Sequence, residues 1–218
     1  MTVLVACEFS GVVRSAFRRL GHDAWSCDLL PAEDGDPHHY QCDVRTLLHQ
    51  DWDLMVAHPP CTYLCSSGLH WNKRRPGRQA LTEQALLFVQ TLMDCPIKRI
   101  AIENPTGCIS TRIRKPDQII QPWMFGHPES KTTCLWLKNL PLLHPTNVLV
   151  KSPGSRWDNQ TPSGQNKLGP SSDRWKLRSL TYPGIAAAMA STWGSALSAK
   201  TVRSEEHTSE LQSHSDLV

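Results

Sequence analysis

The chain has 218 residues, a length that supports one domain with a sizeable hydrophobic core. No apolar run reaches the about 18 residues that a membrane span requires, and the 8 cysteines follow no secretion signal, which indicates reduced thiols and a cytoplasmic protein. The 23 basic and 20 acidic residues give a net charge of +3, which fits a polyanionic partner without requiring one.

The first predicted unit is a strand that runs into a turn and then a helix. The strand begins at residue 3, and the turn contains Phe9, Ser10 and Gly11. The helix carries apolar residues at helical spacing: Val13, Ala16, Phe17 and Leu20. A second strand over residues 22–28 ends in Asp28. An acid at this place in a Rossmann-like sheet commonly binds ribose hydroxyls, and the alternative is a solvated loop acid.

The next buried strand leads into a rigid loop that presents a thiol. Residues 31–39 predict a loop, and residues 40–44 predict a short third strand or an extended turn. After Asp53, residues 54–57 form a short apolar run that two prolines close, so a strand ends in the loop that carries Cys61. At the carboxyl end of a parallel strand this thiol is placed for chemistry, and the alternative is a cysteine buried as a small hydrophobe.

A basic loop, a helix and another strand follow. Residues 65–78 combine Gly and Ser with side chains that suit phosphates and bases, although such a run is also typical of a solvated face: Trp71, Lys73, Arg74, Arg75 and Arg78. An amphipathic helix is predicted with the apolar stripe Ala80, Leu81, Ala85, Leu86, Phe88, Val89 and Leu92. Residues 99–105 predict a strand that contains Glu103 and Asn104 near its end.

Three strand-end motifs in this order resemble those of a known family. The F-x-G turn at Phe9, the Pro-Pro-Cys loop at Cys61 and the Glu-Asn pair at Glu103 are similar to the motifs of the cytosine carbon-5 methyltransferases. The resemblance implies a Rossmann-like α/β fold with a mostly parallel central sheet, S-adenosylmethionine as the cofactor and duplex DNA as the partner. It implies a small phage- or bacterial-type member that acts in a bacterial or phage-infected cell.

The resemblance also implies the residues that hold the cofactor. The six expected contacts are Phe9, Ser10, Gly11, Asp28, Asp43 and Pro59. Phe9 is expected to pack against the adenine, and Gly11 to let the backbone approach the methionine part. Asp28 would grip the ribose, while Asp43 would receive the adenine amino group. The two valines after Gly11 stand where the family commonly has glycines, which puts the cofactor affinity in question.

The implied reaction assigns roles to four residues: Cys61, Glu103, Asn104 and Lys131. The Cys61 thiolate adds to carbon-6 of a cytosine rotated out of the duplex, which makes carbon-5 nucleophilic. Glu103 shares a proton at ring nitrogen 3, for which burial or the base itself must raise its pKa. Asn104 braces the loop, and Lys131 contacts the carbonyl oxygen of the base. The basic loop over residues 71–78 would stabilise the displaced strands.

The second half of the chain departs further from the family. Residues 126–133 look like a degraded Gly-x-Pro-Gln-x-Arg-x-Arg motif, in which Lys131 stands for the first Arg. Residues 141–176, with Arg156 among their basic side chains, fill the place of a larger target-recognition domain, and a surface connector is the alternative. So small a region predicts a short recognition sequence or little sequence preference.

One methyltransferase domain is expected over residues 1–200, with a packed helix at 185–194. Residues 203–218 resemble a translated sequencing-library adapter and are excluded, which makes the remaining chain more basic. No metal is expected, because the clustered cysteines and histidines lack a second pair at zinc-finger spacing. A monomer is expected. Three rival functions stay open: an RNA or nucleotide cytosine methyltransferase, an amino-group methyltransferase, and a catalytically dead nucleic-acid-binding module.

Overall fold

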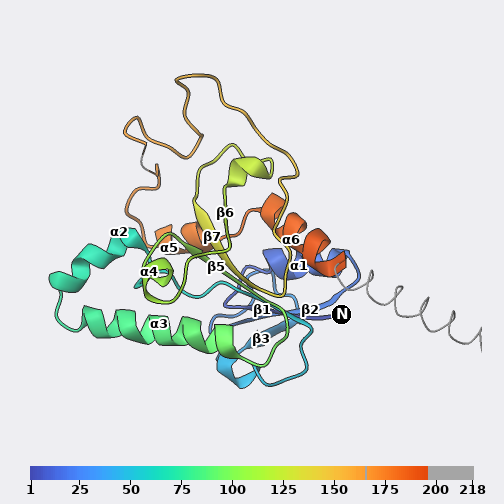
Figure 1. The fold of residues 1–218 in the computed structure, drawn as a ribbon. Helices are drawn as coiled ribbons and strands as arrows, with labels where there is room; N and C mark the ends of the chain where they lie inside the picture. Colours follow the sequence, from blue (N-terminus) through green and yellow to red (C-terminus); the bar gives the residue numbers. More distant parts are fainter. Residues whose placement is uncertain (165, 196–218) are drawn as a thin grey trace, which may run out of the picture.

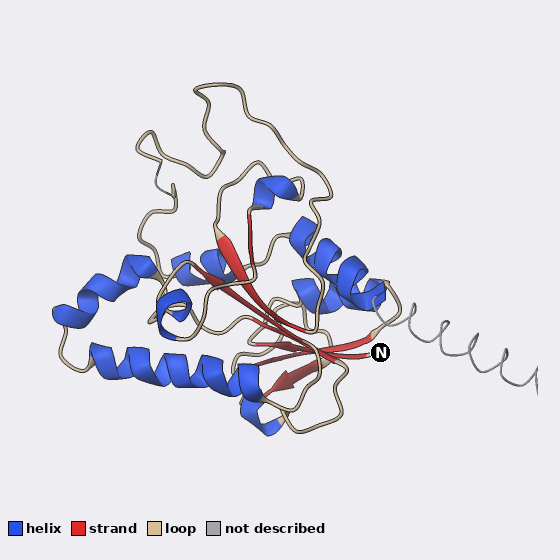
Figure 2. Cartoon of the chain, viewed as in Figure 1, coloured by secondary structure: helices blue, strands red, loops and turns tan. Residues whose placement is uncertain are grey.

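A seven-stranded sheet with the order β3-β2-β1-β4-β5-β7-β6 forms the centre of the computed structural model, which describes residues 1–164 and 166–195 (Figures 1 and 2). The strand pairs from β3 to β5 are parallel, whereas β7 pairs antiparallel with both β5 and β6. The predicted α/β fold with a mostly parallel sheet is therefore confirmed. The strands are β1 (Thr2–Ala6), β2 (Asp23–Asp28), β3 (His39–Gln41), β4 (Leu54–Ala57), β5 (Ile100–Pro105), β6 (Gln118–Ile120) and β7 (Thr133–Lys138).

Helices cover both faces of the sheet (Figure 1). On one face, α1 (Val12–Arg19) and α6 (Pro183–Ser195) pack against Val3, Val5 and Leu54. On the other face, α3 (Arg78–Asp94) packs near Leu4 and Met55. Because side chains alternate along a strand, β1 and β4 need apolar residues at every position to fill both layers. This requirement explains the continuous apolar runs in the sequence.

Shorter elements connect these layers: η1 (Val44–Thr46), α2 (Ser66–Leu69), η2 (His70–Lys73), α4 (Ile109–Arg112), η3 (Pro122–Met124) and α5 (Arg174–Ser179). Most of residues 141–176 run as loops that extend from the sheet and return to it at α5 (Figure 1). The sequence predicts no regular structure in this region, but α5 begins within it. A helix of 6 residues is too short to show a hydrophobic period.

Two helices differ from the predicted apolar patterns. Leu20 is 53% exposed, because α1 ends one residue before it. Ala80 and Leu81 lie in the first turn of α3 and are exposed, whereas Thr82 is buried. The Thr82 hydroxyl donates a hydrogen bond to the Tyr63 carbonyl (3.1 Å), so this turn of α3 holds the loop after β4.

The strand register brings several candidate residues to one edge of the sheet. Ala6 pairs with Ala57, and Ala57 pairs with Ile102, so the residues that follow each of them begin at the same level. The carboxyl ends of β1, β4 and β5 therefore form the candidate site. Within the described part of the chain, no helix combines the length and apolar character needed to cross a membrane. The expected domain end at residue 200 and the adapter-like segment 203–218 lie outside the described residues.

Candidate active site

The loop that carries Cys61 is fixed at both ends. Asn104, buried in β5, donates a side-chain hydrogen bond to the Pro59 carbonyl (2.7 Å). After Cys61 the chain makes one helical turn, because the Leu64 and Cys65 amides both bond to the Cys61 carbonyl (3.0 and 2.9 Å). Proline and these hydrogen bonds leave the loop few alternative conformations.

The segment after β5 packs directly against this turn. The Ser66 amide bonds to the Thr106 carbonyl (3.0 Å), and the Cys108 amide bonds to the Leu64 carbonyl (2.8 Å). A Cβ atom at Gly107 would lie 2.0 Å from the Leu64 carbonyl oxygen, so only glycine fits this approach. The two loops therefore hold the cysteine turn as one unit.

Cys61 and Cys65 form a thiol pair with unequal proton affinities. Cys65 follows Cys61 by one helical turn, and Cys65 Sγ lies 3.2 Å from Ser67 Oγ. The hydrogen bond from Cys61, together with contacts to Ser67 and the Gly68 amide, lowers the pKa of Cys65 to about 5 despite burial. The same sulfur–sulfur contact, burial and the charges of Cys65 and Glu103 raise the pKa of Cys61. The surroundings of the pair therefore favour a proton on Cys61 over one on Cys65.

Burial does not suffice to raise the pKa of Glu103 above its ordinary value, so of the two expected causes the bound base itself stays a prediction. Its carboxylate Oε2 lies 3.1 Å from His58 Nδ1, and the side chains are 15% and 9% exposed. Burial raises the pKa of Glu103, but the hydrogen bond from His58 and the charges of Lys131 and His58 outweigh it and leave the pKa below the ordinary value. A carboxyl group needs solvation or partners to stay charged when buried, and His58 supplies one.

The F-x-G turn is closed by the protein's own charges. Cys7 adopts a left-handed φ of 58°, after which the buried Glu8 carboxylate accepts hydrogen bonds from the amides of Val13 (2.6 Å) and Arg14 (3.1 Å). Glu8 thus caps the amino terminus of α1. The fully buried Arg14 pairs with Asp34. A ligand was expected to approach the backbone at this turn, but Glu8 already accepts hydrogen bonds from the amides at this end of α1.

A cavity of about 800 Å³, here called the Phe9 cavity, opens beside this turn. Phe9, Asp28 and Cys61 line it together with His58 and Cys65. The Phe9 ring lies 5.9 Å from the Trp175 ring of α5, so α5 forms a wall of this cavity. The His58 Nε2 atom is buried without a hydrogen-bond partner in residues 1–164 and 166–195. An unsatisfied buried nitrogen at a cavity wall is a ready contact for a polar ligand.

A second cavity of about 570 Å³, the Lys131 cavity, shares Cys61 and Cys65 with the Phe9 cavity. Lys131 and Tyr182 also line it. The Lys131 ammonium donates to the Leu180 carbonyl (3.2 Å), and Tyr182 donates to Glu129. Burial and this carboxylate raise the pKa of the Tyr182 phenol. The cysteine turn thus contributes thiols to both cavities.

Four of the six expected cofactor contacts lie outside the Phe9 cavity. Asp43 is engaged by Arg45, whose hydrogen bonds hold the pKa of Asp43 below its usual value. The Pro59 carbonyl is bonded to Asn104, and Ser10 lies near Glu8 (3.4 Å). A Cβ atom at Gly11 would collide with Arg14 and Asp34, which fill the space behind the turn. Only Phe9 and Asp28 of the expected set line the cavity.

The expected basic residues divide into two groups. Trp71, Arg75 and Arg78 line the Phe9 cavity, and the Arg75 guanidinium lies 4.4 Å from the centre of the Trp71 ring. Arg78 also donates to the Thr62 carbonyl (2.9 Å), so it braces the cysteine loop. The remaining expected residues, Lys73, Arg74 and Arg156, are exposed and line neither cavity.

Sequence reasoning missed other residues of the two cavities. His58 follows β4 directly, and its place beside the prolines is the one local signal that marks it. Arg174 and Arg178 come from α5, which the sequence does not predict, and Arg178 lines both cavities. Their contribution depends on how a distant segment returns to the sheet.

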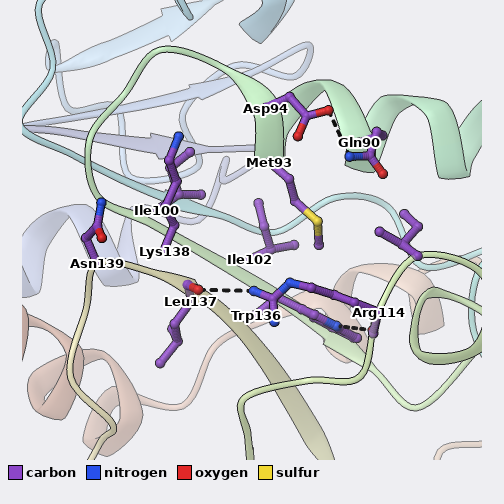
Figure 3. A pocket seen from close by; sticks show the side chains of 11 residues that line it. Gln90, Met93, Asp94, Ile100, Ile102, Arg114, Trp136, Leu137, Lys138 and Asn139 are labelled. Carbon is purple, nitrogen blue, oxygen red and sulfur yellow. Dashed lines mark hydrogen bonds between the residues drawn. The ribbon is translucent and has the colours of Figure 1, made fainter.

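Figure 3 shows a third hollow of about 780 Å³, lined by residues of α3, β5 and β7. Its polar groups bond one another: Trp136 Nε1 donates to the Arg114 carbonyl (2.8 Å), and Gln90 donates to Asp94 (2.8 Å). Arg114 donates in turn to the Leu137 carbonyl (3.0 Å). The hollow therefore offers a polar ligand less than the two cavities at the strand ends do. Within the described residues, no group of three or more acidic, His or Cys side chains could hold a metal ion.

No protein-family model matches this chain, and no curated protein matches it. Among solved structures it is similar to a protein assigned as a DNA modification methyltransferase and encoded within an E. coli prophage, with 15% identity and a TM-score of 0.43 over 68% of this chain and 51% of that one. It is also similar to the Dnmt2 methyltransferase of S. pombe, with 18% identity and a TM-score of 0.44 over 65% and 51%. A mutant DNMT2 of Spodoptera frugiperda gives 14% identity and a TM-score of 0.42 over 72% and 56%. The aligned part of this chain spans about half the length of those structures.

Proposed function

We propose that this protein transfers a methyl group from S-adenosylmethionine to carbon-5 of cytosine in DNA, through a covalent bond between Cys61 and carbon-6 of a flipped-out base. The observation that carries the proposal is that Cys61 lines both of two cavities at the carboxyl ends of β1, β4 and β5. A reaction between two bound molecules needs adjoining sites with the nucleophile at their boundary.

The Phe9 cavity fits the cofactor. The Phe9 ring offers an apolar face, Asp28 offers a carboxylate for ribose hydroxyls, and the unpaired His58 Nε2 offers a polar contact. S-adenosylmethionine supplies an electrophilic methyl group when bound. Since Glu8 caps α1, these side chains would hold the cofactor in place of the helix amides. Asp43 and Gly11 are not part of the proposed contacts, because Arg45 and Arg14 occupy the space around them.

The Lys131 cavity fits the base. Cys61 would add to carbon-6, and the electron pair of the broken ring double bond would move toward carbon-5 and nitrogen 3. Glu103 would take up a proton from solvent as the base enters and share it with nitrogen 3, and Lys131 would face the ring carbonyl. After methylation, carbon-5 loses its proton to water and the carbon–sulfur bond breaks, which releases Cys61. Glu103 lines neither cavity, but its side chain is 15% exposed and its charge acts on Cys61, which supports a contact with a base bonded to that sulfur.

Basic side chains around both cavities support a nucleic-acid substrate. Arg75 stacked on Trp71, together with Arg174 and Arg178, places positive charge and an aromatic ring where a strand would enter. A base must leave the duplex before Cys61 can reach it, so contacts to the displaced strand would stabilise the open state. Residues 141–176 are proposed to supply the few remaining base contacts.

The test is a covalent-adduct experiment with duplex DNA that contains 5-fluorocytosine. Fluorine at carbon-5 blocks the last elimination, so the purified protein with cofactor should give a shifted band on a denaturing gel. Cys61→Ser should abolish the band, whereas Cys95→Ser, which removes a thiol outside both cavities, should retain it.

Parallel reactions with single-stranded DNA and RNA separate the substrate classes. A band with RNA alone would replace DNA by RNA as the substrate. A protein that binds cofactor but gives no band on any of the three would overturn the covalent mechanism and favour an amino-group methyltransferase or an inactive binding module.

A further inference from the structure

The Glu103 carboxylate lies away from both cavities, although the proposed reaction requires it to take up a proton. Its side chain lines neither the Phe9 cavity nor the Lys131 cavity. Within residues 1–164 and 166–195, His58 is the one side chain that hydrogen-bonds it, with 3.1 Å between His58 Nδ1 and Glu103 Oε2. The shortest route for a proton to this carboxylate therefore leads through the imidazole ring.

The strand pairing holds His58 beside Glu103. Ala57 of β4 pairs with Ile102 of β5, so the residues that follow them, His58 and Glu103, lie at the same level of the sheet. The His58 amide donates to the Ala6 carbonyl (2.9 Å), and the His58 side chain is 9% exposed. The backbone of three neighbouring strands thus fixes the distance between the ring and the carboxylate.

The two nitrogens of this ring face different groups. Nδ1 lies against Glu103, whereas Nε2 is buried without a hydrogen-bond partner in the described part of the chain. His58 lines the Phe9 cavity and also a hollow of about 20 Å³, which has room for one water molecule. Glu8, Ser10 and Thr181 line this hollow as well and offer oxygen atoms to such a water. A proton can thus enter the ring at Nε2 beside a bound cofactor.

We propose that His58 relays a proton between solvent at the Phe9 cavity and the Glu103 carboxylate. The inference rests on the proposed function and supplies the route for the proton that Glu103 shares with the base. A proton from solvent binds to Nε2, and the bond between Nδ1 and its hydrogen breaks as that hydrogen passes to Glu103 Oε2. The carboxyl O–H then turns from His58 toward nitrogen 3 of the base. When nitrogen 3 gives up its proton again, the same steps run in reverse and restore the ring and the carboxylate.

The other titratable groups around the ring are engaged elsewhere. Glu8 accepts hydrogen bonds from amides of α1, and Lys131 donates to a backbone carbonyl. Cys7 lines the same hollow, but burial raises the pKa of its thiol to about 12, so it keeps its proton. His58 is therefore the group with one nitrogen at Glu103 and the other free. It acts on the base through Glu103, as a positioning residue.

The first test reads the ring without nucleic acid or cofactor. In protein labelled with ¹⁵N-histidine, the neutral ring of His58 should carry its hydrogen on Nδ1 and leave Nε2 bare, which the NMR shifts of the two nitrogens distinguish. Glu103→Ala removes the acceptor, so the hydrogen should move to Nε2 in a large share of the molecules. His127 is the internal control and should not respond, because its Nε2 accepts from the Gly184 amide (2.9 Å). A hydrogen on Nε2 of the neutral His58 ring in the wild-type protein would overturn the proposal.

The second test measures the rate of adduct formation with cofactor and 5-fluorocytosine DNA. His58→Gln can still donate a hydrogen bond to Glu103 but has no proton to exchange, so it should slow the adduct by about 100-fold. His58→Ala should slow it by a similar factor. Added imidazole should restore much of the rate of His58→Ala, whereas 1-methylimidazole, which has one proton-binding nitrogen, should not. Neither compound should change the rate of His58→Gln, whose side chain fills the space.

Two results of the second test would overturn the relay. A His58→Gln protein that is folded by circular dichroism and reacts as fast as the wild-type protein would show that a hydrogen bond to Glu103 suffices. Equal rescue of His58→Ala by the two compounds would show that a filled space suffices. If the wild-type protein forms no adduct with DNA or RNA, the proposed function fails, and a hydrogen on Nδ1 in the first test would still establish the bond from His58 to Glu103.

Discussion

Two buried glutamates stand at strand ends on either side of β4, and their proton affinities move in opposite directions. Glu8 follows β1, and burial raises its pKa although the α1 amides and nearby positive charges act against it. Glu103 lies in β5, and there the hydrogen bond from His58 and the charges of Lys131 and His58 outweigh burial and lower the pKa. His58 follows β4, and its charge acts on both carboxyl groups.

The difference shows how partners decide what a buried acid does. Glu8 bonds backbone amides of α1, which cannot change their protonation, so it serves as a fixed cap. Glu103 bonds a side chain that can titrate, and both His58 and Lys131 line the cavities. Its proton can therefore respond to a ligand, which is the property that acid–base chemistry requires.

The largest expected difference between the two acids is in turnover. Glu103→Gln keeps the size of the side chain but removes the exchangeable proton, so single-turnover methylation of duplex DNA should slow by about 1,000-fold. Glu8→Gln is the matched variant and should slow it far less, because the amide oxygen can still cap α1. Equal losses in the two variants, with both proteins folded by circular dichroism, would contradict the distinction drawn between them.

The strands that carry these acids can be predicted from the sequence alone, whereas the edge strand β6 and the short helix α5 cannot. β1, β4 and β5 are buried on both faces, and such strands must be continuous apolar runs, which are visible without a structure. β6 has 3 residues and α5 has 6, which is too short for any period to appear. Ala80 and Leu81 were predicted to lie on the apolar stripe of the helix but are exposed. Helical spacing identifies the apolar face of a helix, but not the turn at which that face begins to pack.

The candidate site likewise contains residues that the local sequence predicts and residues whose state depends on distant contacts. The places of Cys61 and Asn104 at strand ends can be predicted from the sequence, because the residues that end a strand are a local signal. The state of Glu103 depends on His58, which is 45 residues away in sequence and reaches it only through the pairing of β4 with β5. The burial of Arg14 likewise cannot be predicted from the sequence, because its partners are distant in the chain. Ser26 lies in β2, and Asp34 lies in the loop after β2.

Removal of His58 also tests the difference between Glu8 and Glu103. His58→Ala leaves the Glu103 carboxylate buried without its hydrogen bond, which should lower the free energy of unfolding at neutral pH by about 2 kcal/mol. The lowered pKa of Glu103 contributes stability above its ordinary value of 4.5 and loses it as the pH falls through the folded-state pKa. His58→Ala should therefore lose less stability on acidification than the wild-type protein.

Urea unfolding at neutral and acidic pH measures both effects. A double-mutant cycle with Glu103→Gln isolates the pair from the other contacts of His58. Additive losses in that cycle would mean that the His58–Glu103 contact contributes nothing to the state of the carboxylate.

The smallest expected effect is that of Glu8 on the pH dependence of the free energy of unfolding. A raised folded-state pKa means that the folded protein holds this proton more tightly than the unfolded chain does, so stability falls as the pH rises from the ordinary value of 4.5 toward the folded-state pKa. Glu8→Gln removes that loss, so its free energy of unfolding should gain on that of the wild-type protein over this interval. Urea midpoints of the two proteins across the same pH series give the difference directly. A variant that instead falls behind as the pH rises would show that the α1 amides hold Glu8 as a carboxylate, in which case both acids are charged at rest and only their partners distinguish them.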